Sequence, residues 1–358
     1  MLSSLSLPVL ILIFLTAAAV VWIAGIQLSN ATDIFSVRFG LGEALGGLLF
    51  LAIATNLPEI AITSTAALRQ NIGIATGNIL GGIAIQTVVL VVLDVFGVRG
   101  RRSLSYLAAS LDLVLEGVLL IAILTVAVMG SQLPPSLIVE RVEPAGLLIT
   151  VLWLAGIWLI GKARTGLPWH AEGHAPGGQT EPRGVAKAKK MHDAQNKGVS
   201  ITRTAIVFIA SAIVTLVAGV VLEMSGGDIA GRVGIDGVLF GSTFLAAATA
   251  LPEVSTGLAA VKLGDYKLAV SDIFGGNAFL PVLFLLASLL SGQAALPQAQ
   301  STDIYLTGLG SLLTAIYLYG LIFRPRLRVL RMGIDSLVVL VLYVVGIVGL
   351  IAVTHGGS

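Results

Sequence analysis

The chain has 358 residues, of which 56% are hydrophobic and 11% are charged, with 21 Lys and Arg, 19 Asp and Glu and no cysteine. Soluble proteins carry about 25% charged residues, so this composition excludes an ordinary water-soluble protein. The lack of cysteine excludes disulfides, thiolate metal sites and cysteine nucleophiles, and a net charge of +2 gives no indication of a nucleic-acid partner.

Apolar runs long enough to cross a bilayer, about 20 residues each, recur along the whole chain. No Lys or Arg precedes the first run, unlike in a secretory signal peptide, so we expect it to be retained as the first helix. The first five predicted spans are 8–28, 42–68, 72–95, 105–129 and 145–162. The second five are 203–223, 237–262, 267–291, 302–323 and 333–353. The sequence therefore predicts an all-α membrane protein of ten transmembrane helices embedded in the lipid bilayer.

The basic residues predict the orientation, because Lys and Arg accumulate in cytoplasmic loops. With the N-terminus outside, 18 of the 21 basic residues fall in cytoplasmic loops, and only Arg69, Arg141 and Arg232 do not. Both termini are then outside, and we expect the plasma (inner) membrane as the location. The hydrophilic stretch 163–202 becomes a cytoplasmic linker, and its Gly, Pro and Lys content is more typical of a disordered connection than of a metal sensor, despite three histidines.

An internal repeat gives the most specific signal. Residues 47–82 align with residues 241–276 at an offset of 194 without a gap, and the offset places Pro58-Glu59 over Pro252-Glu253. Chance similarity between apolar helices rarely repeats a Pro-Glu pair inside a span. Because each unit has an odd number of spans, the second unit enters the membrane from the opposite side. The sequence thus predicts two inverted five-helix repeats, 1–162 and 203–358.

The repeated Pro-Glu pairs indicate a cation site at mid-membrane. Proline breaks or kinks a helix and frees backbone carbonyls, while an uncompensated Glu at a helix centre costs about 2.5–3.5 kcal/mol. A hard cation such as Ca²⁺ or Na⁺ satisfies both groups, and Glu59, Glu253, Thr55 and Thr249 offer only oxygen ligands. The alternative is that the two Glu residues are protonated or paired in a passive helix bundle.

The third helix of each predicted repeat adds polar candidates. Asn78 and Asp272 occupy equivalent places, and small residues around them favour close packing against the broken helix. Gln86 and Asn277 compete for the same role. Alternatively, Asn78 bonds across helices and Asp272 faces a water-filled vestibule. Three acids nearer the membrane edge are expected to be solvated or snorkelling: Asp112, Glu116 and Asp335.

The segments ATNLPE and ATALPE resemble the GTSLPE-type repeat cores of the cation/calcium exchanger superfamily, and GNILGG and SDIFGG resemble its following GNxxGS-type segment. The resemblance implies that Glu59 and Glu253 bind Ca²⁺ and that Thr55 and Thr249 help to form sodium sites. Where the family has Ser after the Thr, this chain has Asn56 and Ala250. The family often has Ser after the last Gly of the repeat, and this chain has Gly82 and Gly276 there. One turn later the family often has Asn or Asp, and this chain has Gln86 and Leu280.

The sequence therefore predicts a secondary antiporter that exchanges Ca²⁺ for Na⁺ or H⁺, with metal-site candidates Glu59, Glu253, Thr55, Thr249, Asp272, Asn78, Asn56 and Gln86 and no cofactor. The resemblance implies that the first and sixth helices slide across the rest. Two alternatives are a proton-coupled exchanger of another cation and a non-transporting cation-binding scaffold or sensor. A membrane enzyme is not expected, because the predicted spans contain no His or Cys and no recognisable nucleophile or phosphate-binding motif.

Overall fold

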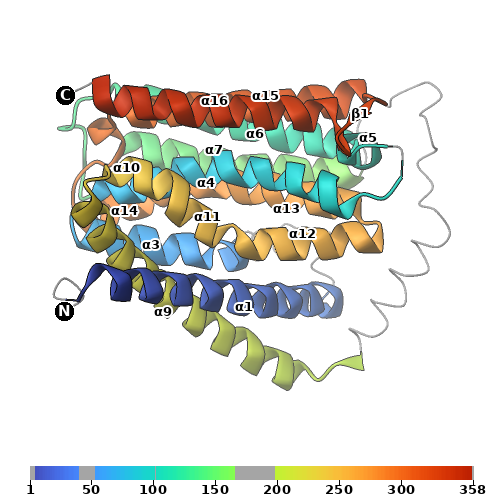
Figure 1. Ribbon diagram of the computed structural model, residues 1–358, viewed down its shortest axis with the longest axis horizontal. Coiled ribbons are helices and arrows are strands. Elements are labelled where there is room, and N and C mark those ends of the chain that lie inside the picture. Colours follow the sequence, from blue (N-terminus) through green and yellow to red (C-terminus); the bar gives the residue numbers. More distant parts are fainter. Residues whose placement is uncertain (1–4, 40–52, 101, 166–197, 357–358) are drawn as a thin grey trace.

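The computed structural model describes residues 5–39, 53–100, 102–165 and 198–356. Eight helices in these ranges are long and apolar enough to cross a membrane, and a bent pair of helices brings the number to nine. Of the remaining expected span, 42–68, only residues from 53 onward are described, and residues 166–197 of the linker, which include its three histidines, lie outside the described residues. The structure is thus a mostly helical membrane protein, arranged as in Figure 1.

The helices are given below in their order along the chain. They are α1 (Leu7–Phe39), α3 (Leu57–Leu68), α4 (Ile72–Val92), the π-helix η3 (Leu93–Gly97), α5 (Leu104–Ala108), α6 (Leu111–Ser131), α7 (Pro144–Thr165), α9 (Ile201–Val233), α10 (Gly237–Phe240), the π-helix η4 (Gly241–Leu245), α11 (Ala246–Thr249), α12 (Leu251–Leu263), α13 (Tyr266–Phe279), the 3₁₀ turn η5 (Leu280–Val282), α14 (Leu283–Ser291), the 3₁₀ turn η6 (Leu296–Gln298), α15 (Ser301–Phe323) and α16 (Ile334–Gly356).

The first and sixth helices are longer than the sequence predicted. α1 and α9 each have 33 residues, or about 50 Å at 1.5 Å per residue, whereas a bilayer core is about 30 Å thick. The first span was predicted to end at residue 28, where the apolar run ends, but the polar residues that follow do not stop the helix. α9 stops only at Gly234, whose φ of 73° is the left-handed conformation that favours glycine. The two helices pack along each other, and α9 runs obliquely to the other helices (Figure 1).

The predicted break in the second helix of each repeat is confirmed where the chain is described. α11 and α12 are separated at Ala250 and enclose a bend of 42°. In the first half, Asn56 is not helical, and α3 begins directly after it. In both places a proline occupies the first turn of the new helix, where its missing N–H needs no partner.

Three local details differ from the predicted elements. The fourth span is preceded by the separate short helix α5, because the chain is extended at Ser110. Pro281 inserts the 3₁₀ turn η5 between α13 and α14, although the apolar run continues through it. The loop before α16 contains a short antiparallel hairpin that was not predicted, in which β1 (Arg328–Val329) pairs with β2 (Met332–Gly333).

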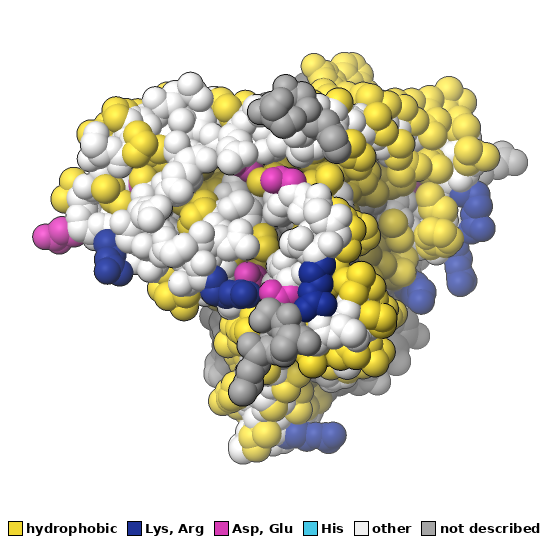
Figure 2. All heavy atoms as spheres, turned by 60° about the vertical axis from the view of Figure 1, so that its left-hand side comes forward, with side chains coloured by type: hydrophobic (Ala, Val, Ile, Leu, Met, Phe, Trp, Pro, Cys, Tyr) yellow, Lys and Arg dark blue, Asp and Glu magenta, His cyan; other side chains and the backbone are white. Residues whose placement is uncertain are grey.

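The centre of the molecule is formed by the third helix of each half. α4 and the α13–α14 pair are mostly buried, whereas less than a quarter of the apolar stretch of α9 and of α16 is buried. The exposed residues on the outer helices are largely Leu, Ile and Val. Figure 2 shows hydrophobic side chains over the right-hand and lower sides of the molecule, with acidic and basic side chains gathered on the end turned toward the viewer. This surface suits lipid, and the buried central helices position the site described below.

Candidate functional site

The two broken helices bring Glu59 and Glu253 together inside the protein. Glu59 is fully buried, and only 5% of Glu253 is exposed. Glu253 lies within electrostatic range of both Glu59 and Asp272. Each Glu is in the first turn of its half-helix, where the positive end of the helix dipole favours a carboxylate. Three of the carboxylate oxygens have no hydrogen-bond partner among the described residues: both oxygens of Glu59 and the Oε2 atom of Glu253.

A threonine lies beside each Glu-bearing half-helix. Thr249 is fully buried next to the Glu59 carboxyl group, and its hydroxyl donates to the carbonyl oxygen of Ala246 at 3.2 Å. This bond uses the hydroxyl proton, so the oxygen remains available only as an acceptor. Thr55 is half-buried, and its Oγ1 atom accepts a long contact from Asn56 Nδ2 at 3.4 Å. Thr249 therefore borders the carboxyl group of the other half of the chain, whereas the contact given for Thr55 is with its neighbour Asn56.

The predicted amides Asn56, Asn78, Gln86 and Asn277 are buried, and two of them, Asn56 at the break before α3 and Gln86 of α4, converge on Gly276. A Cβ atom at Gly276 would lie 3.3 Å from Asn56 Nδ2 and 3.7 Å from Gln86 Oε1. The glycine therefore makes room for both amides. Asn78 is fully buried, and within the described part of the chain neither its oxygen nor its nitrogen is hydrogen-bonded. Asn277 is different, because its Nδ2 donates to the carbonyl of Ile83 at 3.3 Å and bonds across helices.

The expectation that small residues allow close helix packing is confirmed for α4. A Cβ atom at Gly77 would lie 2.6 Å from the carbonyl oxygen of Val238, and one at Gly81 would overlap the backbone of Ser242. Only glycine allows α4 to lie this close to α10 and η4. The π-helix η4 lies directly before the broken segment, and such irregular turns are frequent at functional sites.

The long helices α1 and α9 touch the broken helices through equivalent glycines. A Cβ atom at Gly25 would lie 2.6 Å from Pro252 Cγ, and one at Gly219 would lie 2.7 Å from Ala61 Cβ and 3.1 Å from the carbonyl oxygen of Pro58. Gly25 and Gly219 are 194 residues apart, the same offset as that between the Pro-Glu pairs. Each long helix thus packs on the proline segment of the other half.

Two acids expected at a solvated edge are in fact buried, so this prediction is wrong for Glu116 and Asp335. Each is about 5% exposed. The hydroxyl of Ser271 donates to Glu116 Oε1 at 2.8 Å. Asp335 packs against the backbones of Gly320 and Gly333. Burial followed from close approach between helices distant in sequence, which the pattern of a single helix does not reveal.

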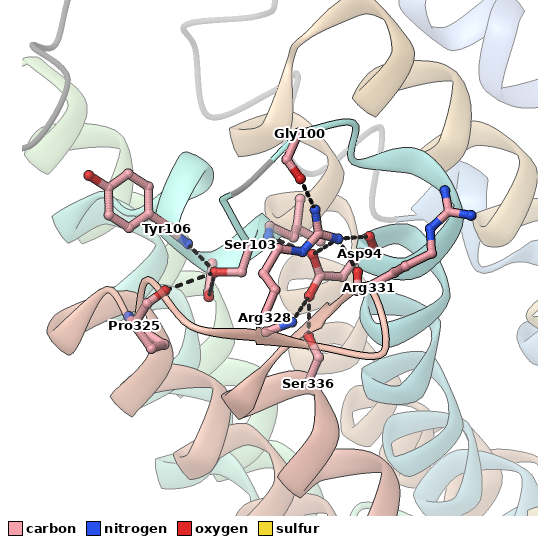
Figure 3. A network of polar contacts seen from close by, with 11 residues as sticks. Asp94, Gly100, Ser103, Tyr106, Pro325, Arg328, Arg331 and Ser336 are labelled. Atoms are coloured by element: carbon pink, nitrogen blue, oxygen red, sulfur yellow. Dashed lines mark hydrogen bonds and ion pairs between the residues drawn. The ribbon is translucent and has the colours of Figure 1, made fainter.

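A second polar network, absent from the predicted site, joins the halves near the hairpin (Figure 3). The carboxylate of Asp94 accepts from the backbone N–H of Leu104 at 2.9 Å, from that of Gly333 at 2.7 Å and from Ser336 Oγ at 2.9 Å. Arg328 pairs with it at 3.5 Å and also donates to nearby carbonyl oxygens. The sequence signal that could have revealed this network is Asp94 itself, a single acidic residue within an apolar run. Its hydrogen bonds are saturated by protein, so this network holds loops together.

Three further buried acids were missed by the sequence analysis: Glu143, Glu223 and Asp303. Glu223 of α9 is fully buried and forms an ion pair with Arg69 at 3.0 Å, which ties α9 to the end of α3. Glu143, directly before α7, accepts from the backbone N–H of Leu296 at 3.1 Å. Burial raises the pKa of Glu143 above its ordinary value, and the hydrogen bond from Leu296 opposes that rise.

The site is not a compact cluster of acids. Across the described ranges, no three carboxylates or imidazoles gather closely enough to hold a metal ion between them. A cation between Glu59 and Glu253 therefore also needs neutral oxygen ligands from hydroxyls, amides or the carbonyls freed at the breaks. No Lys or Arg occurs in α3, in α4 or in residues 251–261 of α12, so a basic side chain from these segments does not neutralise the pair.

Broken apolar helices that enclose unpaired carboxylates define a membrane transporter of the exchanger type. The sodium/calcium exchanger protein family matches residues 9–161 and 203–352, so the chain belongs to this family of membrane antiporters, which are not enzymes. Inner membrane protein YrbG of Escherichia coli (strain K12) is 24% identical over 292 residues, which cover 81% of this chain and 82% of that protein.

Two solved structures share the fold. The crystal structure of the H⁺/Ca²⁺ exchanger CAX gives a TM-score of 0.67 at 14% identity, and the match covers 96% of this chain and 82% of that one. The sodium-calcium exchanger NCX_Mj, soaked with 10 mM Na⁺ and no Ca²⁺, gives a TM-score of 0.62 at 16% identity, with 96% and 99% covered. At these identities the likeness establishes the arrangement of the helices.

Proposed function

We propose that this protein is a secondary cation antiporter that exchanges Ca²⁺ for Na⁺ or H⁺ across the plasma (inner) membrane. The observation that carries the proposal is the pair Glu59 and Glu253, two buried neighbouring carboxyl groups. Both oxygens of Glu59 and the Oε2 atom of Glu253 lack hydrogen bonds in the described part of the chain. Membership of the exchanger family supports a transport role for this pair. CAX and NCX_Mj are H⁺/Ca²⁺ and sodium-calcium exchangers respectively, which supports Ca²⁺ as one of the two ions.

The proposed architecture is ten transmembrane helices in two inverted repeats, 1–162 and 203–358, joined by the linker 163–202 on the cytoplasmic side, with both termini outside. The paired contacts of Gly25 with Pro252 and of Gly219 with Pro58 support it, because they repeat at the offset of 194. In this arrangement the half-helices α3 and α12 enter the site from opposite sides of the membrane.

Within this site we assign roles by chemistry. Glu59 and Glu253 supply the charged ligands, and Thr55 and Thr249 supply hydroxyl oxygens. The amides Asn56, Asn78 and Gln86 supply neutral oxygens, and Asp272 adds a lateral carboxylate. Hydroxyl, amide and carboxylate oxygens are the ligands that Ca²⁺ and Na⁺ prefer.

Exchange follows from the charge of the empty site. Two or three carboxylates without a counter-charge are costly to move through the low-dielectric centre of a membrane. A site filled by Ca²⁺, or by Na⁺ ions or protons, is nearly neutral. The loaded forms are therefore the ones that change access from one side to the other, and transport of one ion requires return of another.

The test uses purified protein in vesicles and measures uptake of radioactive Ca²⁺. One set of vesicles carries an outward Na⁺ gradient at constant pH, and a second carries only a pH gradient, so the counter-ion is identified directly. Uptake driven by one gradient identifies that ion, whereas exchange of a different cation by either gradient would replace Ca²⁺ in the proposal.

Glu59→Gln and Glu253→Gln are each expected to abolish exchange, because each removes a charged ligand while keeping the shape of the side chain. The matched control is Glu140→Gln, in an exposed loop outside the site. Normal uptake by either site variant would refute the assignment. Cation-dependent thermal stability without any ion flux would instead identify a non-transporting scaffold or sensor.

A further inference from the structure

A small cavity lies between α4, α6, α14 and α15. It has room for about one water molecule or one small ion. Most of the described residues that line it are apolar, and none of them is basic. Four of them are polar, and these are Thr76, Ser131, Asp303 and Thr307.

Asp303 brings an unpartnered carboxylate oxygen to this cavity. The residue is only 4% exposed and lies in the first turn of α15. Its Oδ2 atom accepts the backbone N–H of Gln300 at 2.8 Å and so caps the helix. Its Oδ1 atom is buried and has no hydrogen-bond partner in the described part of the chain. The capping role therefore accounts for one oxygen of the carboxylate and leaves the other without a partner.

The three hydroxyl groups that line the cavity have no free proton to offer this oxygen. Thr76, Thr307 and Ser131 each donate to a carbonyl oxygen of the preceding turn, at 2.9, 2.7 and 2.8 Å respectively. A hydroxyl that has donated its proton can act only as an acceptor. The polar side chains around the cavity thus present oxygen lone pairs and no donor.

A lining of acceptors that includes one carboxylate suits a small monovalent cation. A water molecule could donate to two of the oxygens, but it would leave a buried charge uncompensated, which is costly. A hard cation satisfies the lone pairs and the charge together. Asp303 is the one acid among the lining residues, so Na⁺ is neutralised here, whereas Ca²⁺ would keep a net charge.

The cavity is separate from the paired Glu site. Thr76 and Leu80 line it from α4. Successive residues of an α-helix point about 100° apart, so Asn78, a proposed ligand of the paired site, points about 200° away from Thr76. The internal repeat places Val270 opposite Thr76 in the other half, so this position is polar in one half only.

The polar residues lie at the end of the molecule opposite the hairpin. Asp303 is near the start of α15 and Thr76 near the start of α4, and Ser131 is the last residue of α6. α15 runs from this end toward β1 (Figure 1), and Figure 2 turns this end toward the viewer. Asp236, an exposed acid before α10, lies within electrostatic range of Asp303. An exposed acid here attracts cations from the solution on this side.

We propose that this cavity binds one Na⁺ through four ligands, which are the Oδ1 atom of Asp303 and the hydroxyl oxygens of Thr76, Ser131 and Thr307. The ion joins three helices, α4, α6 and α15, and so stabilises their packing. The site goes beyond the proposed function, since it binds Na⁺ whichever ions are exchanged at the paired Glu site.

The test measures thermal unfolding of the purified full chain in detergent, with NaCl replaced by choline chloride at constant ionic strength and pH. It uses both the unsubstituted chain and the double variant Glu59→Gln/Glu253→Gln, in which Na⁺ cannot act through the carboxylate pair. Na⁺ at ten times its dissociation constant is expected to raise the melting temperature by about 3–6 °C in both. Asp303→Asn is expected to abolish this rise, because it removes the charge and places an amide N–H group at the cavity.

Thr307→Val removes one hydroxyl ligand, and Thr314→Val is its matched control. Both threonines are buried in α15 and donate to a carbonyl one turn earlier, but Thr314 does not line the cavity. Thr307→Val should weaken the apparent Na⁺ affinity about tenfold, and Thr314→Val should leave it unchanged. Equal Na⁺ dependence in these two variants would overturn the site, even if Asp303→Asn does not fold.

A melting temperature that does not respond to Na⁺ but rises as pH falls would also overturn the site, in favour of a proton on Asp303. A Na⁺ response that persists in Asp303→Asn but disappears in the double Glu variant would place Na⁺ at the pair instead. Failure of this site is distinguishable from failure of the proposed function, because Ca²⁺ uptake into vesicles tests exchange alone. The Na⁺ response is measured in a variant that lacks both Glu carboxylates.

Discussion

Replacing Gly219 with alanine tests how closely the long helix α9 must fit against the proline segment of α3. A Cβ atom at this position would lie 2.7 Å from Ala61 Cβ and 3.1 Å from the carbonyl oxygen of Pro58. Nonbonded carbon atoms rest about 3.5–4.0 Å apart, so α9 must move outward by roughly 1 Å. Overpacking of this kind costs about 1–3 kcal/mol. Alanine also favours the helix over glycine by about 1 kcal/mol, which offsets part of this cost.

Gly231→Ala in the same helix separates the two effects. Gly231 is exposed, and no described atom lies within 4 Å of a Cβ atom there. The control therefore keeps the gain in helix propensity without the clash. Thermal unfolding in detergent should show Gly219→Ala melting below the control by roughly 2–4 °C for each kcal/mol of overpacking. Ca²⁺ exchange should also be slower in Gly219→Ala, because Glu59 directly follows the displaced Pro58. Equal melting temperatures for the two variants would refute the packing argument.

Two further predictions concern buried acids outside the ion site. Asp94→Asn leaves the backbone N–H groups at this carboxylate short of an acceptor and leaves Arg328 without its counter-charge. We expect a loss of about 3–5 kcal/mol in unfolding free energy, with unchanged Ca²⁺ affinity. A melting temperature equal to that of the wild type would contradict this prediction. Glu143 has a pKa raised above 4.5 by burial, so the folded protein loses stability as pH rises from about 4.5 through that raised value. Glu143→Gln should flatten this part of the curve of melting temperature against pH, and an unchanged slope would refute it.

Much of the site could be predicted because its signals are local and repeated. A proline cannot continue a helix without losing a hydrogen bond, so the break at Ala250 followed directly from Pro252. Glu59 and Glu253 stood out because a charged residue in an apolar run is costly and these two recur at one offset. The convergence of Asn56 and Gln86 at Gly276 had no such signal, since it depends on two segments from one half meeting a helix from the other.

The amino-acid sequence alone determined the membrane environment, the positions of the helix breaks and the two acids beside them, because composition, proline geometry and the repeat act within one segment at a time. Only the tertiary structure decided which acids are buried together. Glu116 and Asp335 looked like edge residues along their own helices, yet Ser271 and the backbone of Gly320 reach them from distant parts of the chain. Burial is a property of neighbours, and the neighbours of a helix face are set by how the two halves pack against each other.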